Sequence, residues 1–185
     1  MQQSGDRTNK MNRAVFLDRD GVLNKAFTSK GTPYPPSSLA QVEILEGVAE
    51  SISELKSRNY ELIVVTNQPD VARGKTTVAF VNKVHQMITS ILDLQHFYVC
   101  YHEDSDQCPC RKPKDGLLRM AAKDLHIDLK SSFMVGDRWR DIAAGNSAGC
   151  KCYFIDYSYS EPAPEMPFTR VFSLAEATRD IIGAP

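Results

Sequence analysis

Residues 13–22 read RAVFLDRDGV, an apolar run that gives way to two carboxylates and a glycine. The run has the composition of a strand buried on both faces, as in a parallel sheet. Asp18 and Asp20 are two residues apart where this strand passes into a loop, and Gly21 permits a tight turn there. Both carboxylates can therefore face one point. Taken alone the pair is weak evidence, because acidic residues at loop ends are usually only solvated.

Apolar runs of this kind alternate along the chain with segments of helical spacing. The runs that predict strands are residues 13–20, 61–68, 97–102, 131–137, 151–156 and 169–172. The helical segments are residues 48–55, 81–91, 141–149 and 174–182, together with one that begins at Leu117. This order predicts an α/β fold, a doubly wound, Rossmann-like parallel sheet with helices on both faces. The proline-rich stretches 32–38 and 160–167 are predicted to be loops.

Length and charge restrict the class of protein. With 185 residues, 42% of them hydrophobic, the chain suits one domain over residues 1–185, of which 1–11 read as a flexible N-terminal segment. The net charge of −1 does not favour nucleic acid or an anionic membrane surface, so we expect a small soluble ligand. We expect a cytoplasmic monomer, since the sequence shows neither a signal peptide, nor a membrane span, nor a leftover apolar helix stripe.

The polar residues that end the predicted strands are the candidate site. In doubly wound sheets ligands bind beyond the carboxyl ends of the strands. The residues there are Asp18, Asp20, Thr66, Asn67, His102 and Asp137. A cluster of carboxylates of this kind suits Mg²⁺, which prefers oxygen ligands.

The four motifs of the haloacid dehalogenase superfamily of phosphatases resemble, in order and strand position, four features of this sequence: Asp18 with Asp20, residues 66–68, residues 111–112, and Asp137 with Asp141. The resemblance implies that Asp18 is the nucleophile and forms an aspartyl phosphate, while Asp20 is the general acid and base. It implies that Thr66 and Lys112 clamp the phosphoryl group. The Mg²⁺ ligands would be Asp18, the backbone carbonyl of Asp20 and Asp137, with Asp141 either a further ligand or the residue that orients Lys112.

Four further residues have the chemistry of a zinc site. Cys100 and His102 form one close pair and Cys108 and Cys110 a second, which together supply the four ligands of a closed tetrahedral Zn²⁺ site. Such a site is structural, and here it would brace a polar loop directly before Arg111 and Lys112. The alternative is a set of buried thiols with an incidental histidine. That interpretation does fit Cys150 and Cys152, which enter a predicted buried strand.

The segments FLDRDGVLN (16–24), VVTNQ (64–68) and CRKP (110–113) resemble one subgroup of the superfamily. It contains the D-glycero-D-manno-heptose 1,7-bisphosphate phosphatases and the histidinol-phosphate phosphatases, and the resemblance implies a minimal cap. The activity implied is removal of the C7 phosphate of the heptose bisphosphate, with histidinol phosphate or another sugar or polyol phosphate as the alternative. The substrate-binding residues implied are Arg19, Thr66, Asn67, Gln68, Arg111, Lys112 and Arg138. The pair Pro69-Asp70 departs from the Ser-Gly usual after TNQ.

Two other classes use similar residues. A phosphorelay receiver combines aspartates, a threonine and a lysine, but its acceptor aspartate lies on a middle strand and not on the first. A zinc-dependent nucleic acid binder would show a basic face and stacking aromatic residues. Among the histidines, His85 and His126 are predicted to be solvated or to cap helices.

Overall fold

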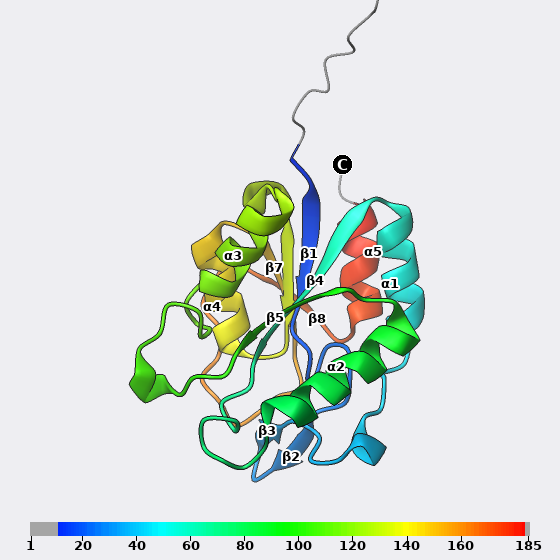
Figure 1. The fold of residues 1–185 in the computed structure, drawn as a ribbon. Coiled ribbons are helices and arrows are strands. Elements are labelled where there is room, and N and C mark those ends of the chain that lie inside the picture. Colours follow the sequence, from blue (N-terminus) through cyan, green and yellow to red (C-terminus); the bar gives the residue numbers. More distant parts are fainter. Residues whose placement is uncertain (1–10, 184–185) are drawn as a thin grey trace, which may run out of the picture.

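The computed structural model describes residues 11–183, which are built around a six-stranded sheet of parallel strands (Figure 1). The strand order is β5-β4-β1-β6-β7-β8. Their bounds are β1 Arg13–Leu17, β4 Tyr60–Asn67, β5 His96–Cys100, β6 Phe133–Gly136, β7 Lys151–Ile155 and β8 Thr169–Val171. Each of the six predicted strands is present. The flexible segment predicted over residues 1–11 lies, except for Met11, outside the described residues.

Helices cover both faces of the sheet, which confirms the doubly wound α/β prediction (Figure 1). On one face lie α1 (Val48–Ser57), α2 (Val78–Leu92) and α5 (Leu174–Gly183), and on the other α3 (Gly116–Leu125) and α4 (Trp139–Ala148). Alternate residues of β1 serve the two cores: Val15 and Leu17 pack with the first set of helices, Ala14 and Phe16 with the second. This double burial explains the continuous apolar run. The described residues also form three 3₁₀ turns, η1 Leu39–Gln41, η2 Asp104–Asp106 and η3 Leu129–Ser131.

The chain changes direction in the sheet beside β1. From β1 it proceeds outward to β4 and β5, and it then crosses back to place β6 on the other side of β1. Connections leave these neighbouring strands toward opposite faces, which opens a crevice at their carboxyl ends. Asp18 follows β1 and Asp137 follows β6 at this crevice, and the amide of Asp18 donates to the carbonyl of Val135 at 3.0 Å.

A small hairpin corrects one sequence prediction. Part of the stretch 32–38, predicted to be a loop, forms β3 (Thr32–Tyr34), which pairs antiparallel with β2 (Phe27–Ser29). Two residues join the strands, and both have positive φ, 50° at Lys30 and 77° at Gly31. That is the geometry of a two-residue hairpin with a type I′ turn, for which a glycine at the second position is the usual signal. The predicted loop over residues 160–167 is confirmed.

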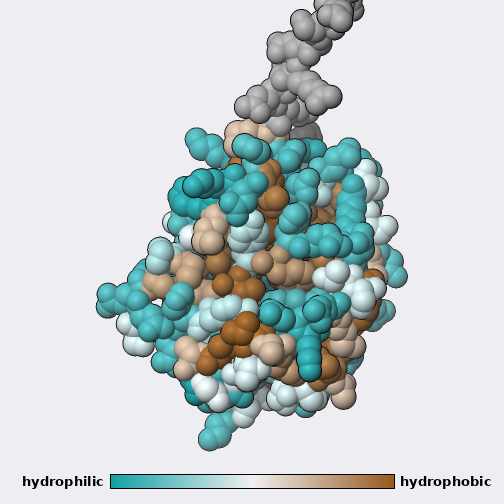
Figure 2. Space-filling model, in the orientation of Figure 1, coloured by the Kyte–Doolittle hydropathy of each residue, from teal (hydrophilic) through white to brown (hydrophobic). Residues whose placement is uncertain are grey.

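The face drawn in Figure 2 is mainly hydrophilic at its edges, with hydrophobic residues showing in its middle, where the edge strand β5 runs. Four of the five residues of β5 are only partly buried. Within residues 11–183, no helix has both the length and the apolar character needed to cross a membrane.

Candidate active site

The ammonium group of Lys112 lies at the centre of the crevice, where three acceptors surround it. It donates to Oδ1 of Asp18 at 2.8 Å and to the backbone carbonyl of Val65 at 2.7 Å, and it forms an ion pair with Oδ1 of Asp141 at 2.6 Å. These three contacts use the three donors of an ammonium group. The lysine and both carboxylates are buried, so the predicted nucleophile and the predicted phosphate clamp are held in a fixed relation.

The carboxylates of this crevice are crowded, and their titration reflects it. Burial raises the pKa of Asp18 to about 6, with Asp141 and Asp20 adding to the shift and Lys112 opposing it. Burial, then the charges of Asp18 and Asp141, raise the pKa of Asp137 well above its usual value. Burial alone would lower the pKa of Lys112, yet the adjacent Asp141 and Asp18 raise it above its ordinary value, so this lysine is charged. The crevice thus holds more negative charge than one lysine can balance.

The arrangement fits a divalent cation. Carboxylate oxygens of Asp18, Asp137 and Asp141 lie within 4.8 Å of one another. Three carboxylates and one ammonium leave two negative charges, which one Mg²⁺ would neutralise. Oδ1 of Asp137 is buried and has no hydrogen-bond partner among residues 11–183, as expected of an oxygen that ligates a metal. The φ of Gly21 is 88°, and a Cβ on it would lie 2.0 Å from Oδ2 of Asp137, so only glycine fits beside this carboxylate.

A residue that the sequence analysis did not identify holds Asp137 in place. The hydroxyl of Tyr159 donates to Oδ2 of Asp137 at 2.9 Å. Burial and the charge of Asp137 raise the pKa of Tyr159, which keeps the hydroxyl protonated as a donor. Tyr159 lies in the loop between β7 and β8, and the next residue, Ser160, donates its amide to Gly31 of the β2–β3 hairpin at 2.9 Å. The hairpin and this loop thus support each other beside the crevice.

The predicted proton donor, Asp20, is surrounded by hydrogen-bond donors. Its carboxylate accepts from Nδ2 of Asn24 at 3.0 Å and from Nε2 of Gln68 at 3.0 Å. Arg19 donates from Nη2 at 2.8 Å and from Nε at 3.2 Å to the same carboxylate. Arg19 was predicted to bind substrate, but the structure places its guanidinium elsewhere: the side chain is 1% exposed, and it is absent from the described residues that line the cavity.

Thr66 and Asn67 at the end of β4, and Gln68 directly after it, make different contacts. The hydroxyl of Thr66 accepts from Nε2 of Gln68 at 3.0 Å, and both side chains line the cavity. Asn67 binds the backbone of Lys112 twice, as its Nδ2 donates to the carbonyl at 3.0 Å and its Oδ1 accepts from the amide at 3.1 Å. Asn67 therefore positions the lysine while also lining the cavity.

A cavity of about 350 Å³ opens above these residues. It is lined by the predicted residues Asp18, Asp20, Thr66, Asn67, Gln68, Arg111, Lys112, Asp137, Arg138 and Asp141. Its rim also carries basic residues that the sequence analysis did not identify, namely Arg73, Lys75 and Arg140. Residues 32–35, which include β3 of the hairpin, form another part of the wall. The cavity is thus acidic at its floor and basic at its rim, which suits a ligand with more than one anionic group.

Acidic residues hold the rim arginines in place. Oδ1 of Asp104 lies 2.8 Å from Nε of Arg111 and 3.1 Å from Nη1 of Arg140. Arg138 pairs with Glu161, which belongs to the same loop as Tyr159. The sequence held no signal for the pairings of Arg138 and Arg140, whose partners lie 23 and 36 residues away along the chain.

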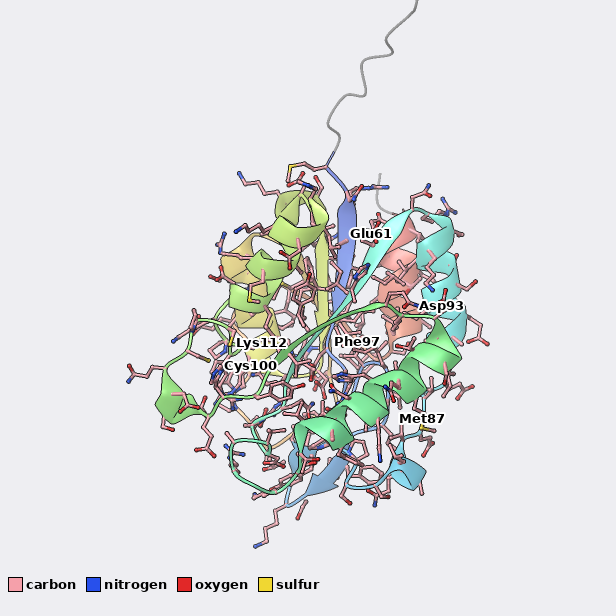
Figure 3. All side chains as sticks on the ribbon, in the orientation of Figure 1. Glu61, Met87, Asp93, Phe97, Cys100 and Lys112 are labelled. Atoms are coloured by element: carbon pink, nitrogen blue, oxygen red, sulfur yellow. The ribbon has the colours of Figure 1, made fainter. Side chains whose placement is uncertain are left out.

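The four predicted zinc ligands lie together at one end of β5, close to Lys112 (Figure 3). Sγ of Cys110 lies 3.3 Å from Sγ of Cys100, 3.4 Å from Sγ of Cys108 and 3.4 Å from Nδ1 of His102. Cys100 lies 3.6 Å from the same nitrogen and 3.7 Å from Cys108. Zn–S bonds of about 2.3 Å in a tetrahedron separate neighbouring sulfurs by about 3.8 Å, so the cluster fits Zn²⁺ with a small expansion.

The predictions for the remaining cysteines and for two histidines have different outcomes. Cys150 and Cys152 are buried at β7, as predicted. The prediction of a solvated or capping role for His85 is wrong, because this α2 residue is buried, stacks on Phe97 of β5, and contacts Arg19. His126 does cap the C-terminus of α3, as predicted, in the left-handed conformation.

Comparison with known proteins agrees with this geometry. A model of the HAD-hydrolase-like family matches residues 109–169. The D-glycero-beta-D-manno-heptose-1,7-bisphosphate 7-phosphatase of Pasteurella multocida is 38% identical over 152 residues, which are 76% of this chain and 79% of that protein. The enzyme of the same name from Escherichia coli K12 is 38% identical over 147 residues, 73% of this chain and 74% of its own.

A solved structure extends the similarity to the fold. The D,D-heptose 1,7-bisphosphate phosphatase from B. bronchiseptica, complexed with magnesium and phosphate, superposes with a TM-score of 0.79 at 26% identity, and the match covers 92% of this chain and 98% of that one. The relatives are named phosphatases. The protein is therefore a phosphatase that belongs to the haloacid dehalogenase-like family of the D-glycero-beta-D-manno-heptose-1,7-bisphosphate 7-phosphatases.

Proposed function

We propose that the protein removes the C7 phosphate of D-glycero-D-manno-heptose 1,7-bisphosphate in a Mg²⁺-dependent reaction. The observation that carries the proposal is the buried pairing of Asp18 with Lys112 at the floor of a cavity whose rim is basic. The names of the relatives indicate the substrate. A sugar with two phosphates suits the cavity because one phosphate would meet Asp18 and Lys112 while the other would meet rim arginines such as Arg111 and Arg138.

The first half of the reaction transfers the phosphoryl group to the protein. A carboxylate oxygen of Asp18 forms a bond to phosphorus as the bond between phosphorus and the C7 oxygen breaks. Asp20, protonated at this stage, gives its proton to the departing oxygen. Lys112 and the hydroxyl of Thr66 bind the phosphoryl oxygens and offset the charge that develops on them. Asp18, Asp137 and the backbone carbonyl of Asp20 would hold Mg²⁺, which would supply further charge neutralisation when bound.

The second half restores the carboxylate. A water oxygen attacks phosphorus, the bond between phosphorus and Asp18 breaks, and inorganic phosphate leaves. Asp20 takes the proton that the water loses, which returns it to its starting state. In this scheme Asp141 orients Lys112, a role supported by their 2.6 Å separation.

The cysteine and histidine cluster is proposed to bind a structural Zn²⁺. Four ligands leave no open coordination position for chemistry. The metal would fix the segment from Cys100 to Cys110, and Lys112 follows two residues later. Loss of the metal would therefore reduce turnover indirectly, through displacement of the lysine.

The test is phosphate release in the presence of Mg²⁺, with kcat/KM compared for heptose 1,7-bisphosphate and for histidinol phosphate. A preference of about a hundredfold for the heptose, worth about 2.7 kcal/mol in transition-state binding, would support the proposal. The reverse preference would assign histidinol phosphate instead, and equally slow release from both would point to another sugar or polyol phosphate. Asp18→Asn is the control, and activity that survives it would overturn the mechanism.

Further attributes remain predictions. These are a single domain over residues 1–185, a monomeric state, a cytoplasmic location, and a small phosphorylated metabolite as partner in place of nucleic acid or membrane. Light scattering coupled to size exclusion would test the monomer directly.

A further inference from the structure

A buried arginine connects the proposed proton donor to helix α2. The guanidinium of Arg19 is one of the largest fully buried groups of the described chain, at 1% exposure. Two of its nitrogens, Nε and Nη2, bind the carboxylate of Asp20. The third, Nη1, lies 3.2 Å from Nε2 of His85, 66 residues further along the chain. The proposed reaction gives no role to this third contact.

The direction of that contact is fixed by chemistry. A guanidinium group has only donors, so Nε2 of His85 must be the acceptor, and the imidazole ring must be neutral with its proton on Nδ1. The surroundings agree, because burial and the charge of Arg19, opposed by Asp20, lower the pKa of His85 to about 4.

The ring itself is held in a fixed plane. It stacks on Phe97 of β5 with ring centroids 4.6 Å apart and planes inclined by 20°. Figure 3 shows Phe97 on the side of β5 that faces α2. His85 is therefore a rigid acceptor placed by two elements, and rigidity in an acceptor restricts the rotation of the group that donates to it.

We infer that His85 is a positioning residue for the proton donor: it anchors Arg19, and Arg19 holds the Asp20 carboxylate where it meets the leaving oxygen. This inference rests on the role proposed for Asp20. It replaces the substrate-binding role predicted for Arg19, whose side chain lies behind Asp20 and away from the cavity. An error of about 1 Å in the position of such a group costs on the order of 100-fold in rate.

The variants separate the acceptor from the stacking. His85→Phe keeps an aromatic ring against Phe97 but removes the acceptor, whereas His85→Gln removes the ring but can place an amide oxygen near the Nε2 position. Phe97→Leu keeps the acceptor but removes the ring that fixes its plane, so it should show the same pattern as His85→Phe at smaller size. His85→Leu provides a second variant without an acceptor if His85→Phe does not fold, and thermal unfolding of every variant checks folding.

The experiment compares kcat and kcat/KM for two substrates whose leaving groups differ in their need for protonation. A sugar phosphate has an alkoxide leaving group that must be protonated, while the leaving group of p-nitrophenyl phosphate departs without protonation. For p-nitrophenyl phosphate, kcat/KM reports only transfer to Asp18, and kcat also includes the later attack of water, which needs Asp20 as base.

We expect His85→Phe to lower kcat/KM for the sugar phosphate by about 10- to 100-fold and to change kcat/KM for p-nitrophenyl phosphate by less than about threefold. For the aryl substrate kcat should fall, with accumulation of phosphorylated protein, and His85→Gln should recover most of the loss. Equal losses of kcat/KM on both substrates, or a His85→Gln as impaired as His85→Phe, would overturn the inference. Asp20→Asn separates the two proposals. If Asp20→Asn does not lose kcat/KM selectively on the sugar phosphate, the role proposed for Asp20 fails. If Asp20→Asn shows this selective loss and His85→Phe does not, only the role of His85 fails.

Discussion

Nζ of Lys112 lies 2.8 Å from Oδ1 of Asp18, although 94 residues separate the two in the sequence. The side chains are 2% and 10% exposed, so this charged contact is made almost without water. Such a pair is informative about function, because burial of charge costs stability unless it is compensated, and a hydrophobic pair would fill the same space at lower cost. The catalytic roles proposed for Lys112 and Asp18 therefore explain this pair better than a contribution to stability does.

Replacement of Lys112 should damage both activity and stability. Lys112→Met leaves Asp18 and Asp141 facing each other without the ammonium between them, and breaking a buried pair in this way costs about 3–5 kcal/mol. Phosphate release should be lost. Denaturant unfolding measures the free energy of unfolding, with Lys123→Met as the control, since Lys123 is exposed and its removal should change stability by less than about 0.5 kcal/mol. A Lys112→Met protein as stable as the control would contradict the role of this contact.

Stability of the metal-free protein should fall as pH rises. Burial raises the pKa of Asp18 to about 6, and that of Asp137 is also raised, so the folded protein keeps protons that the unfolded chain releases. The contribution of these raised pKa values to the free energy of unfolding is complete below the ordinary aspartate pKa near 4. It is lost as pH rises through about 6. Because Mg²⁺ competes with these protons, its addition should raise Tm more at about pH 7.5 than at about pH 5. Calorimetry with and without Mg²⁺ tests this. Asp18→Asn should show a smaller dependence on pH.

Removal of a zinc ligand should affect a region larger than the cluster. Cys110→Ser is expected to lower the zinc content, to lower Tm, and to reduce kcat because Lys112 is only two residues away. Elemental analysis and thermal unfolding measure the first two effects. Cys150→Ala is the matched control, since this buried thiol lies outside the cluster and its loss should leave the zinc content unchanged. Full activity in a Cys110→Ser protein without zinc would refute the indirect effect on turnover.

Tyr159 should tune the affinity for Mg²⁺. Without the hydroxyl that holds Oδ2 of Asp137, the metal-facing oxygen is less well oriented, and losses of this kind weaken metal binding by about 10- to 100-fold. We expect Tyr159→Phe to raise the Mg²⁺ dissociation constant by about tenfold, measured by titration calorimetry, with a smaller effect on KM for substrate. Tyr157→Phe, which alters the ring stacked on Tyr159, should bind Mg²⁺ as the parent does. Equal affinities in all three proteins would remove Tyr159 from the metal site.

The sheet and the meeting of the carboxylates at one edge of it were predictable because their signals are local. An apolar run such as residues 14–17 is buried on both faces, and a parallel strand needs no information from distant residues to be identified. The carboxyl ends of such strands converge, so the order of Asp18, Thr66 and Asp137 along the chain was enough to place them at one edge. The clustering of Cys100, His102, Cys108 and Cys110 was predictable for the same reason, since two close pairs lie within a short segment.

The residues that support the site were not predictable, because their positions depend on packing between distant segments. Tyr159 reaches Asp137 from a loop that rests on the β2–β3 hairpin. His85 lies on a helix, where one position in the pattern does not show which neighbour it meets. The hairpin did have a local signal in Lys30-Gly31, but the prolines around it indicated a loop more strongly.

The contact between the end of β1 and the lysine after β5 has a consequence for biosynthesis. Asp18 leaves the ribosome early, while its partners Lys112 and Asp141 follow about a hundred residues later. A nascent chain that stops before α4 has already completed β1, which leads into Asp18, yet it lacks Asp141, the second carboxylate that holds Lys112. Truncated products of translation should therefore be inactive, not merely slow. During refolding, recovery of phosphatase activity would mark the step at which the strands around β1 have assembled.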